Sequence, residues 1–404
     1  MNRIKLPLLA LYLSLAPLVC EGANANPEQA KGISPVSGLI AEPKDDQAKA
    51  IADIRELGGG VTVDEKSPDK PVIEVRMEAP SASGDWLAHI EGFSKLETLH
   101  LMGPAVTDAT LRHLKRLSQL QELSLAGSSV KGTGLANLKA LSKLRLLDLT
   151  GARLTDIGLT GLEGMTELRE LCLGGTPISD DALIHLKGLR QLTFLDLEST
   201  TVGDAGLTHL KHLSQLKTLD LASTKVTGAG LAHLEGLTRL ERLFLARTEV
   251  GDSGLARLKG LTRLRSLTLL ETKNVTDAGL AELGGLATLE SLNLAGTKVT
   301  DAGLTHLKGL TNLESLDLPE KVTDAGLASL KDLTKLKSLG LGATQVTDVG
   351  IEYLKALIHL DSLTLLDTKV TAAGVRALQK ALPKCHILYG RSEEAVPSLP
   401  GEQR

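Results

Sequence analysis

Six histidines occupy equivalent positions in a segment that recurs along the chain, and histidine is the commonest protein ligand for transition metals. They are His89, His113, His185, His209, His233 and His306. His185, His209 and His233 follow one another at intervals of 24 residues, so stacking of consecutive segments would bring them onto one surface. One interpretation is a surface zinc site. The other, which we favour, is a solvated position copied by duplication, because helices on an outer surface splay apart and no fixed carboxylate accompanies the histidines.

The other residue types that could do chemistry form no recognisable catalytic arrangement. The sequence has no P-loop, no dinucleotide-binding glycine pattern after a strand, no His-Glu-x-x-His and no Cys-x-x-Cys. Thr-Asp pairs such as Thr300-Asp301 recur with the segment, which favours helix capping over acid–base catalysis. Cys172 has no histidine beside it in the pattern to activate a thiol. We therefore expect a protein that is not an enzyme and that uses no metal and no cofactor.

The elements that position these residues follow from a repeat of about 24 residues between Val72 and Leu382. Each copy opens with the pattern apolar-x-x-apolar-x-apolar, which predicts a short strand. The thirteen copies begin at Val72, Leu96, Leu120, Leu144, Leu168, Leu192, Leu216, Leu240, Leu264, Leu289, Leu313, Leu336 and Leu360. The interval is 24 residues except for 25 after Leu264 and 23 after Leu313. Both differences fall between the strand and the second half of the copy, where loops accept changes in length.

The second half of each copy predicts a short helix. Leu304, Leu307 and Leu310 recur at intervals of three and would share one helical face. Thr300 is placed to cap the start of that helix, and Gly309 lies where the helix is expected to end. One copy cannot fold alone, because ordering its backbone costs more free energy than the burial of its few apolar side chains contributes. Stability therefore has to come from stacking of the copies.

The strand pattern followed by Val-Thr-Asp-x-Gly-Leu resembles the leucine-rich repeat family over about three quarters of the chain. The helical motif is similar to the cysteine-containing subtype of F-box substrate receptors, and the whole looks most like the 24-residue repeats of bacterial secreted proteins. Thr replaces the usual Asn or Cys after the strand at Thr176, Thr200, Thr224, Thr248, Thr272, Thr297, Thr344 and Thr368. Early copies have Pro80, Pro104, Ser128 and Ala152 there, which predicts a weaker hydrogen-bonded ladder at the N-terminal end. The resemblance implies an α/β solenoid, a horseshoe with a parallel β-sheet on its concave face and short helices on its convex face.

Composition and pattern divide the chain into six segments. We predict a signal peptide at 1–25, a linker at 26–44, an N-terminal cap at 45–71, the repeats at 72–383, a C-terminal edge strand at 384–389 and a disordered tail at 390–404. The cap is expected to contain a helix with Ile51, Ile54 and Leu57 on one face, followed by a short strand at 61–63. A loose tail in place of the cap is the alternative.

The N-terminus has the composition of a secretory signal. Basic residues precede an apolar stretch, residues 6–19, that is shorter than an ordinary membrane span. Ala23-Asn-Ala25 fits cleavage after Ala25, which would give a secreted or periplasmic protein with no integral membrane span. Two alternatives would anchor the chain to a membrane: lipidation at Cys20, or retention of the uncleaved N-terminus.

Composition also limits the kinds of partner. Aromatic residues make up 2% of the chain, the net charge is −4 and there is no basic run, so we expect no nucleic-acid partner. Cleavage would leave Cys172 and Cys385, about nine repeats apart and too distant for a disulfide in a rigid array. An export signal without a cysteine-rich cap favours a bacterial exported protein over an animal ectodomain.

The concave face is expected to bind the partner, because solenoids present extended concave surfaces. Two residues of each strand point outward there: the residue before the central apolar residue (first outward position) and the residue after it (second outward position). The candidate partner-binding residues at these positions are Glu170, Cys172, Phe194, Asp196, Asp220, Arg242 and Phe244. Two exposed phenylalanines ringed by charge have the composition of an interface hot spot. Divergence of the repeats is the alternative explanation, since single surface apolar residues are common.

These features predict an exported, non-enzymatic scaffold that binds a protein or peptide ligand on its concave face. The alternative is an F-box-like substrate receptor of a ubiquitin ligase. Such a receptor needs a helical adaptor-binding segment, and the segment before the repeats, residues 45–57, predicts one helix only. The secretory signal also argues against the alternative.

Overall fold

The computed structural model describes residues 45–78 and 87–392. The expected signal peptide and linker, and the last twelve residues of the expected tail, lie outside the described residues. The chain divides into two compact units. We call them the N-terminal unit, described at 45–78 and 87–218, and the C-terminal unit, described at 219–392. The division falls inside strand β8 (Thr218–Asp220).

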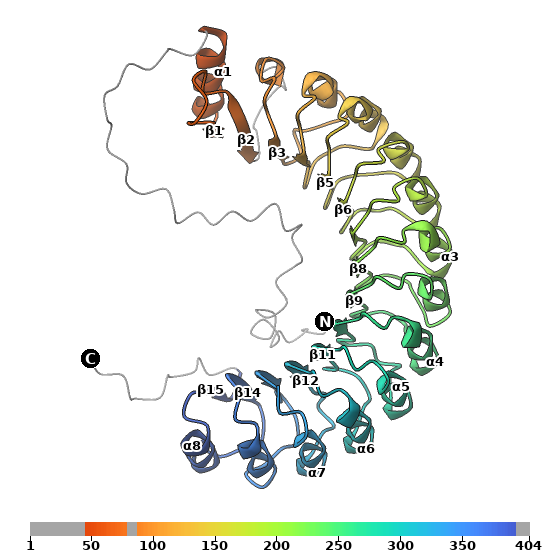
Figure 1. Cartoon of the computed structure of the whole chain (residues 1–404), viewed down its shortest axis with the longest axis vertical. Coiled ribbons are helices and arrows are strands. Elements are labelled where there is room, and N and C mark those ends of the chain that lie inside the picture. Colours follow the sequence, from red (N-terminus) through yellow and green to blue (C-terminus); the bar gives the residue numbers. More distant parts are fainter. Residues whose placement is uncertain (1–44, 79–86, 393–404) are drawn as a thin grey trace, which may run out of the picture. The chain divides into compact units, whose positions relative to one another are not determined.

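The strands of the N-terminal unit are paired in the order in which they occur along the chain (Figure 1). They are β1 (Gly60–Val63), β2 (Val72–Glu78), β3 (Thr98–Met102), β4 (Glu122–Ser124), β5 (Leu146–Asp148), β6 (Glu170–Cys172) and β7 (Phe194–Asp196). The helices are α1 (Asp45–Glu56), α2 (Leu87–Ile90), η4 (Thr110–Arg116), η5 (Thr133–Ala140), η6 (Asp156–Leu162), η7 (Asp180–Leu186), α3 (Asp204–Leu207) and η8 (Leu210–His212). Strand β1 is antiparallel to β2, and the later pairs as far as β7 are parallel.

The C-terminal unit continues the same alternation of strand and helix. Its strands are β9 (Arg242–Phe244), β10 (Ser266–Thr268), β11 (Ser291–Asn293), β12 (Ser315–Asp317), β13 (Ser338–Gly340), β14 (Ser362–Leu366) and β15 (His386–Gly390). Its helices are η9 (Gly230–Leu234), α4 (Asp252–Leu255), η10 (Ala256–Gly260), α5 (Asp277–Leu283), α6 (Asp301–Leu304), η11 (Thr305–Gly309), α7 (Asp324–Leu327), η12 (Ala328–Leu330), η13 (Gly350–Ala356) and α8 (Ala372–Ala381). Strand β15 pairs in parallel with β14 over five residues.

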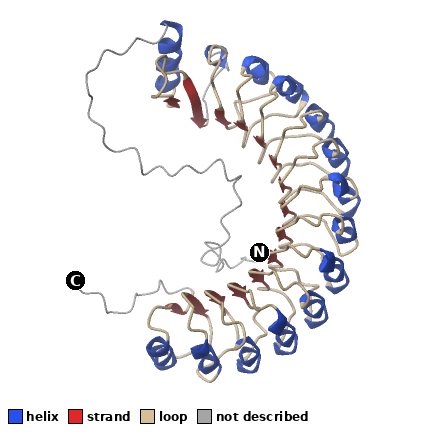
Figure 2. Cartoon of the chain, in the orientation of Figure 1, coloured by secondary structure: helices blue, strands red, loops and turns tan. Residues whose placement is uncertain are grey.

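Equivalent residues of successive copies lie side by side in the sheet. Ser291, Leu292 and Asn293 of β11 pair with the three residues of β12 one copy later. Because side chains alternate between the two faces of a strand, this register stacks the central leucines on one side and the outward positions on the other. Leu292 is 1% exposed and Leu316 is 0% exposed. Within each unit, the strands line the inner side of the curve and the helices line the outer side (Figure 2).

The helical halves are shorter and tighter than a single α-helix. In most early copies they are 3₁₀ helices, and in several later copies one α-helical turn leads into a 3₁₀ turn, as in α6 and η11. Leucines at intervals of three suit this geometry, because a 3₁₀ helix has three residues per turn. The expected cap of α6 is confirmed, since Thr300 Oγ1 accepts a hydrogen bond from the Ala302 amide. Gly309 is the last residue of η11, where an end was expected.

The threonine that follows most strands closes the turn of its own copy. Thr176, Thr248 and Thr344 each donate a hydrogen bond from Oγ1 to the carbonyl oxygen three residues earlier, over 2.5, 2.7 and 2.7 Å. Ala152 and Pro104, at the same position in early copies, have no side-chain donor. The bond stays inside one copy, and the early copies with Ala152 and Pro104 lack it.

Helix α1 lies beside the first repeat strands and buries part of one face. Ala50 is 2% exposed and Ile54 is 0% exposed. Leu57, expected on the same buried face, is 45% exposed because the helix ends one residue before it. The three-residue apolar face predicted from the sequence is therefore wrong at its last member.

Candidate functional site

The recurring Thr-Asp pairs join neighbouring copies. The Asp277 carboxylate accepts two hydrogen bonds from Thr300 one copy later, from the backbone amide and from Oγ1, both at 2.7 Å. Asp301 makes the same two contacts with Thr323, at 2.8 and 2.6 Å. The pattern also joins Asp156 to Ser179, Asp252 to Thr276, Asp324 to Thr347 and Asp348 to Thr371. These carboxylates therefore stabilise the contact between neighbouring copies. The sequence predicted helix capping for the Thr-Asp pairs and did not predict this contact.

Two histidines of the recurrent row are held by carboxylates from the preceding copy. His113 Nδ1 lies 2.6 Å from Glu91 Oε1, and His185 Nδ1 lies 2.7 Å from Glu163 Oε1. The expectation that no carboxylate accompanies these histidines is therefore wrong, because the partner lies 22 residues earlier in the chain and not within the same copy. The side chain of His89 lies outside the described part of the structure. Within residues 45–78 and 87–392, no group of three or more His, Cys, Asp or Glu side chains could hold a metal ion.

A row of polar side chains occupies the second outward position of four adjacent strands in the N-terminal unit. Its members are Arg76, His100, Ser124 and Asp148, which are paired in register from β2 to β5. Ser124 donates a hydrogen bond from Oγ to Asp148 Oδ2 over 2.7 Å, and the Thr150 amide donates to Asp148 Oδ1. The sequence reasoning did not select this row, although polar residues at the same position of four consecutive copies were a visible signal.

Two of the candidate residues, Phe194 and Cys172, form part of a buried apolar cluster on the same unit. Phe194 of β7 clusters with Cys172 of β6 and Leu146 of β5, and their exposed fractions are 6, 2 and 6%. The expectation that Phe194 is exposed is therefore wrong in the structure. Cys172, placed at an outward position by the sequence, is likewise buried. The free cysteine of the described residues is Cys385, and burial raises the pKa of its thiol to about 11.

The other candidates of the N-terminal unit are acidic. Glu170 lies at the first outward position of β6 and is half-buried. Asp196 lies at the second outward position of β7, is 7% exposed and accepts a hydrogen bond from the Glu198 amide over 2.8 Å. Burial raises the pKa of Asp196 from 3.8 to about 6, and the charges of Glu198 and Asp148 act in the same direction. The face thus holds a carboxylate whose ionised form is poorly solvated.

The raised pKa of Asp196 gives a testable pH dependence of stability. The folded state holds this proton more tightly than the unfolded state, so stability falls as the pH rises from 3.8 to about 6 and stays reduced above that. We expect Asp196→Asn to raise the free energy of unfolding by about 1–3 kcal/mol at pH ~7.5 and to change it little at pH ~4. The amide oxygen of asparagine can still accept the Glu198 amide hydrogen. Urea unfolding at the two pH values measures the difference, and equal changes at both would refute the assignment.

The remaining three candidates lie in the C-terminal unit. Asp220 is 6% exposed and accepts a hydrogen bond from the Ala222 amide over 2.8 Å. Arg242 and Phe244 flank the buried Leu243 of β9, and both are half-buried at the outward positions. The expected seven-residue surface therefore divides between the units, with Glu170, Cys172, Phe194 and Asp196 on one and these three residues on the other.

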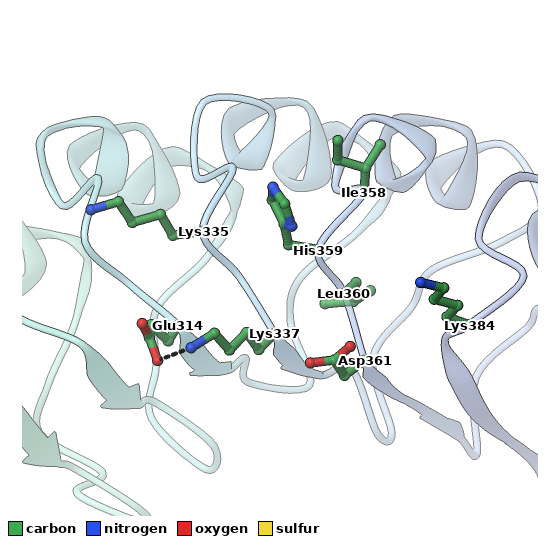
Figure 3. A pocket seen from close by; sticks show the side chains of 8 residues that line it. All are labelled: Glu314, Lys335, Lys337, Ile358, His359, Leu360, Asp361 and Lys384. Carbon is green, nitrogen blue, oxygen red and sulfur yellow. Dashed lines mark hydrogen bonds and ion pairs between the residues drawn. The ribbon is translucent and has the colours of Figure 1, made fainter.

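A hollow of about 350 Å³ lies in the C-terminal unit, along the loops that precede β12 to β15 (Figure 3). Two of its lysines are held by residues of the preceding copies. Lys337 donates to Glu314 Oε2 over 2.8 Å, and Lys335 donates to Asn312 Oδ1 over 2.7 Å. Figure 3 shows Lys384 on the other side of the hollow from Lys335. This arrangement resembles inter-copy pairing on the surface more than a built anion site.

The model of the protein family described as Leucine Rich repeat matches residues 285–307. Compared with curated proteins, the sequence has no significant match. Among solved structures, the chain is similar to an internalin of Listeria monocytogenes, with 23% identity and a TM-score of 0.63 over 85% of this chain and 94% of the internalin. It is also similar to a leucine-rich repeat protein of Leptospira interrogans, with 20% identity and a TM-score of 0.53 over 86% of this chain and all of that one.

These likenesses agree with the repeating fold described above. At such identities they bear on the fold and not on what is bound. In the described residues, no helix is long and apolar enough to cross a bilayer. By its architecture and by its likeness to these structures, the chain has the leucine-rich repeat fold.

Proposed function

We propose that this protein is an exported, non-enzymatic scaffold that binds a protein or peptide ligand on the sheet face of its repeats. The leucine-rich repeat fold is typical of scaffolds for protein–protein interaction. The observation that carries the proposal is the composition of the outward positions. Stacking of the copies needs the central leucines, whereas the outward positions vary from copy to copy, and those of the N-terminal unit hold five carboxylates beside an apolar cluster.

The C-terminal unit supplies a second, more exposed anchor. Phe244 and Arg242 flank the same buried leucine of β9, so both side chains are on the sheet face and both are half-buried. Aromatic residues and arginine are the residue types that most often dominate binding energy at protein interfaces. Further along the same face, the first outward position carries serine from β10 to β14. The contrast favours β9 as the binding part of this unit.

The export part of the proposal is supported by the sequence. Residues 1–25 have the basic start, apolar stretch and small-residue cleavage site of a secretory signal, and they lie outside the described residues. The alternative F-box-like receptor receives no support from the described residues, in which a single 12-residue helix, α1, precedes the repeat strands.

Capture experiments with the mature chain test the proposed surface. We expect Phe244→Ala to reduce capture of the dominant protein ligand at least tenfold, because it removes an aromatic anchor. Phe194→Ala is expected to reduce capture as well, and its thermal melt must be measured because Phe194 is 6% exposed. The control is Thr364→Ala, which truncates the second outward position of β14, where the residue is half-buried. Equal capture by the Phe244 and Thr364 variants would reject β9 as an anchor.

A further inference from the structure

Negative charge on the sheet face is concentrated in the N-terminal unit. The outward positions of β2 to β7 carry the carboxylates Glu74, Glu122, Asp148, Glu170 and Asp196. One cation, Arg76, shares these positions, and its guanidinium is paired with Glu74. The outward positions of the C-terminal unit carry two carboxylates in its described strands, Asp220 of β8 and Asp317 of β12. The outward positions of the N-terminal unit therefore hold more carboxylates than cations.

Two of these carboxylates are held in conditions that disfavour their ionised form. Burial raises the pKa of Glu122, and the charge of Glu74 raises it further. Burial also raises the pKa of Asp196. Neighbouring carboxylates that are poorly solvated and repel one another are common at functional sites, where a ligand of positive charge offsets the repulsion. Burial raises the pKa of Asp317 in the C-terminal unit as well, so what distinguishes the N-terminal face is the number of carboxylates it holds.

His100 gives an independent indication that a polar group is missing from this face. It lies at the second outward position of β3 between the buried Leu99 and Leu101, so its ring is on the sheet face and not in the core. The side chain is 5% exposed, and its Nε2 is a buried polar atom with no hydrogen-bond partner in the structure. Ser124, its neighbour in register, uses its hydroxyl to donate to Asp148. Buried polar atoms normally have a partner, so an orphaned one calls for an explanation.

The charge state of His100 indicates which kind of group would satisfy it. Burial lowers its pKa, and the nearby Arg76 lowers it further, so the ring is neutral at physiological pH. A neutral imidazole has one nitrogen that accepts a hydrogen bond. The neighbouring side chains offer more acceptors, since Glu74, Glu122 and Asp148 are carboxylates. In the tautomer with its hydrogen on Nδ1, the unpartnered Nε2 accepts a hydrogen bond, and a donor with positive charge, as on lysine or arginine, would satisfy both this nitrogen and the carboxylates.

The spacing of the strands sets the distance between two such cations. Neighbouring strands lie about 4.8 Å apart, so the three to four steps from β3 or β4 to Asp196 on β7 cover about 14–19 Å. An extended peptide advances about 3.3 Å per residue. Basic residues about four to six positions apart would then reach the His100–Glu122 end and the Asp196 end of the face at once.

We propose that the sheet face of β2 to β7 binds an extended basic segment of a protein partner, with one Lys or Arg beside His100 and Glu122 and a second beside Asp196. This inference deepens the proposed function and rests on it, because it assumes that the sheet face is the binding surface. It adds the chemistry of the partner, the spacing of its cations and the unit that holds it.

Selection from a library of random dodecapeptides by the immobilised mature chain tests the proposal. We expect the selected peptides to carry Lys or Arg pairs four to six positions apart, and their affinity in fluorescence anisotropy to weaken as ionic strength rises. Glu122→Gln and Asp196→Asn should each weaken binding about tenfold. Asp317→Asn is the matched control, because it removes the same charge from the second outward position of β12 and should leave the affinity unchanged.

A third variant separates binding from folding. His100→Leu removes the orphaned nitrogen, so we expect a melting temperature at or above that of the parent chain together with a tenfold loss of peptide affinity. Selected peptides that lack cations, or affinities unaffected by Glu122→Gln, would overturn the inference. If such peptides still depend on Phe244, the proposed function stands while the inference fails. If no selected peptide depends on any outward position, or none is selected, both fail.

Discussion

Replacement of Leu339 by aspartate is expected to unfold the repeats of the C-terminal unit. Leu339 is the central residue of β13, is 1% exposed and is paired in register with Leu316 and Leu363 of the neighbouring strands. The substitution loses about 1.5–3 kcal/mol of apolar burial. It also places an unpaired charge among leucines, which costs about 3–5 kcal/mol more. The sum is comparable with the whole stability of an ordinary domain. Circular dichroism and a thermal melt measure the loss.

The matched control lies one residue away on the same strand. Ser338→Asp introduces the same side chain at the first outward position of β13, where the residue is half-buried, and should change stability by less than about 1 kcal/mol. A shift of the register by one residue would exchange the two results, because neighbouring residues of a strand point to opposite faces. Similar melts for the two variants would therefore show that the register is wrong.

The Leu339 variant should also reveal how far the copies depend on one another. Each copy of a solenoid contacts its neighbours and draws much of its stability from those interfaces. We expect amide protons of β12 and β14 to exchange faster in the variant than in the parent chain. Unchanged protection in both neighbouring strands would mean that the copies fold independently, against the energetic argument for stacking.

A coupled pair of substitutions should have the second largest effect. A methyl group at Gly303 would lie 2.3 Å from Asp277 Oδ1 and 3.0 Å from Val299 Cγ1. The carboxylate cannot easily withdraw, because it accepts two hydrogen bonds from Thr300. We expect Gly303→Ala to lower the free energy of unfolding by about 2 kcal/mol, through displacement of a carboxylate that joins two copies.

The double-mutant cycle with Asp277→Ala identifies the cause. Asp277→Ala alone should cost about 2–3 kcal/mol, because two hydrogen bonds to a charged group are lost. Asp277→Ala also removes the carboxylate oxygen with which a methyl group at residue 303 would clash. The double variant should therefore be more stable than the sum of the single effects predicts, by about 1–2 kcal/mol. Additive losses would show that Gly303 is needed for another reason.

Gly236→Ala is the matched control for this cycle. A methyl group there would meet no atom within 4 Å, and the residue is exposed. We expect its stability to stay within about 0.5 kcal/mol of the parent chain, since surface substitutions away from special features have small effects. A loss as large as that of Gly303→Ala would argue for a general intolerance of alanine in these turns.

The fold could be predicted from the sequence because its signal is a period. Leucines that return every 24 residues place the central residue of each strand, and the structure has strands at those places. Three-residue spacing in the second half indicated helices, and Thr300 was identified as a cap that the structure confirms. These features depend on residues close together in the chain, which is why the sequence was sufficient for them.

The candidate site was harder to predict, because it depends on contacts between copies. The sequence placed Phe194 and Cys172 at outward positions, but their burial follows from clustering with Leu146, which lies 26 residues before Cys172. Likewise, Glu91 and Glu163 come from the copies before those of the histidines they hold. His100 was passed over, because an orphaned nitrogen can be identified only when every neighbour is placed.

By itself, the sequence determined the number and register of the copies, the strand and helix in each, and which residues line the core. The tertiary structure decided what the polar residues do: the aspartates of the Thr-Asp pairs bind the next copy, Cys385 is buried, and His100 stands among carboxylates without a partner. The physical reason is the distance along the chain between the residues that determine each feature. Apolar periodicity is written within one copy, whereas hydrogen bonds, desolvation and charge depend on side chains that stacking brings together from copies 22 or more residues apart.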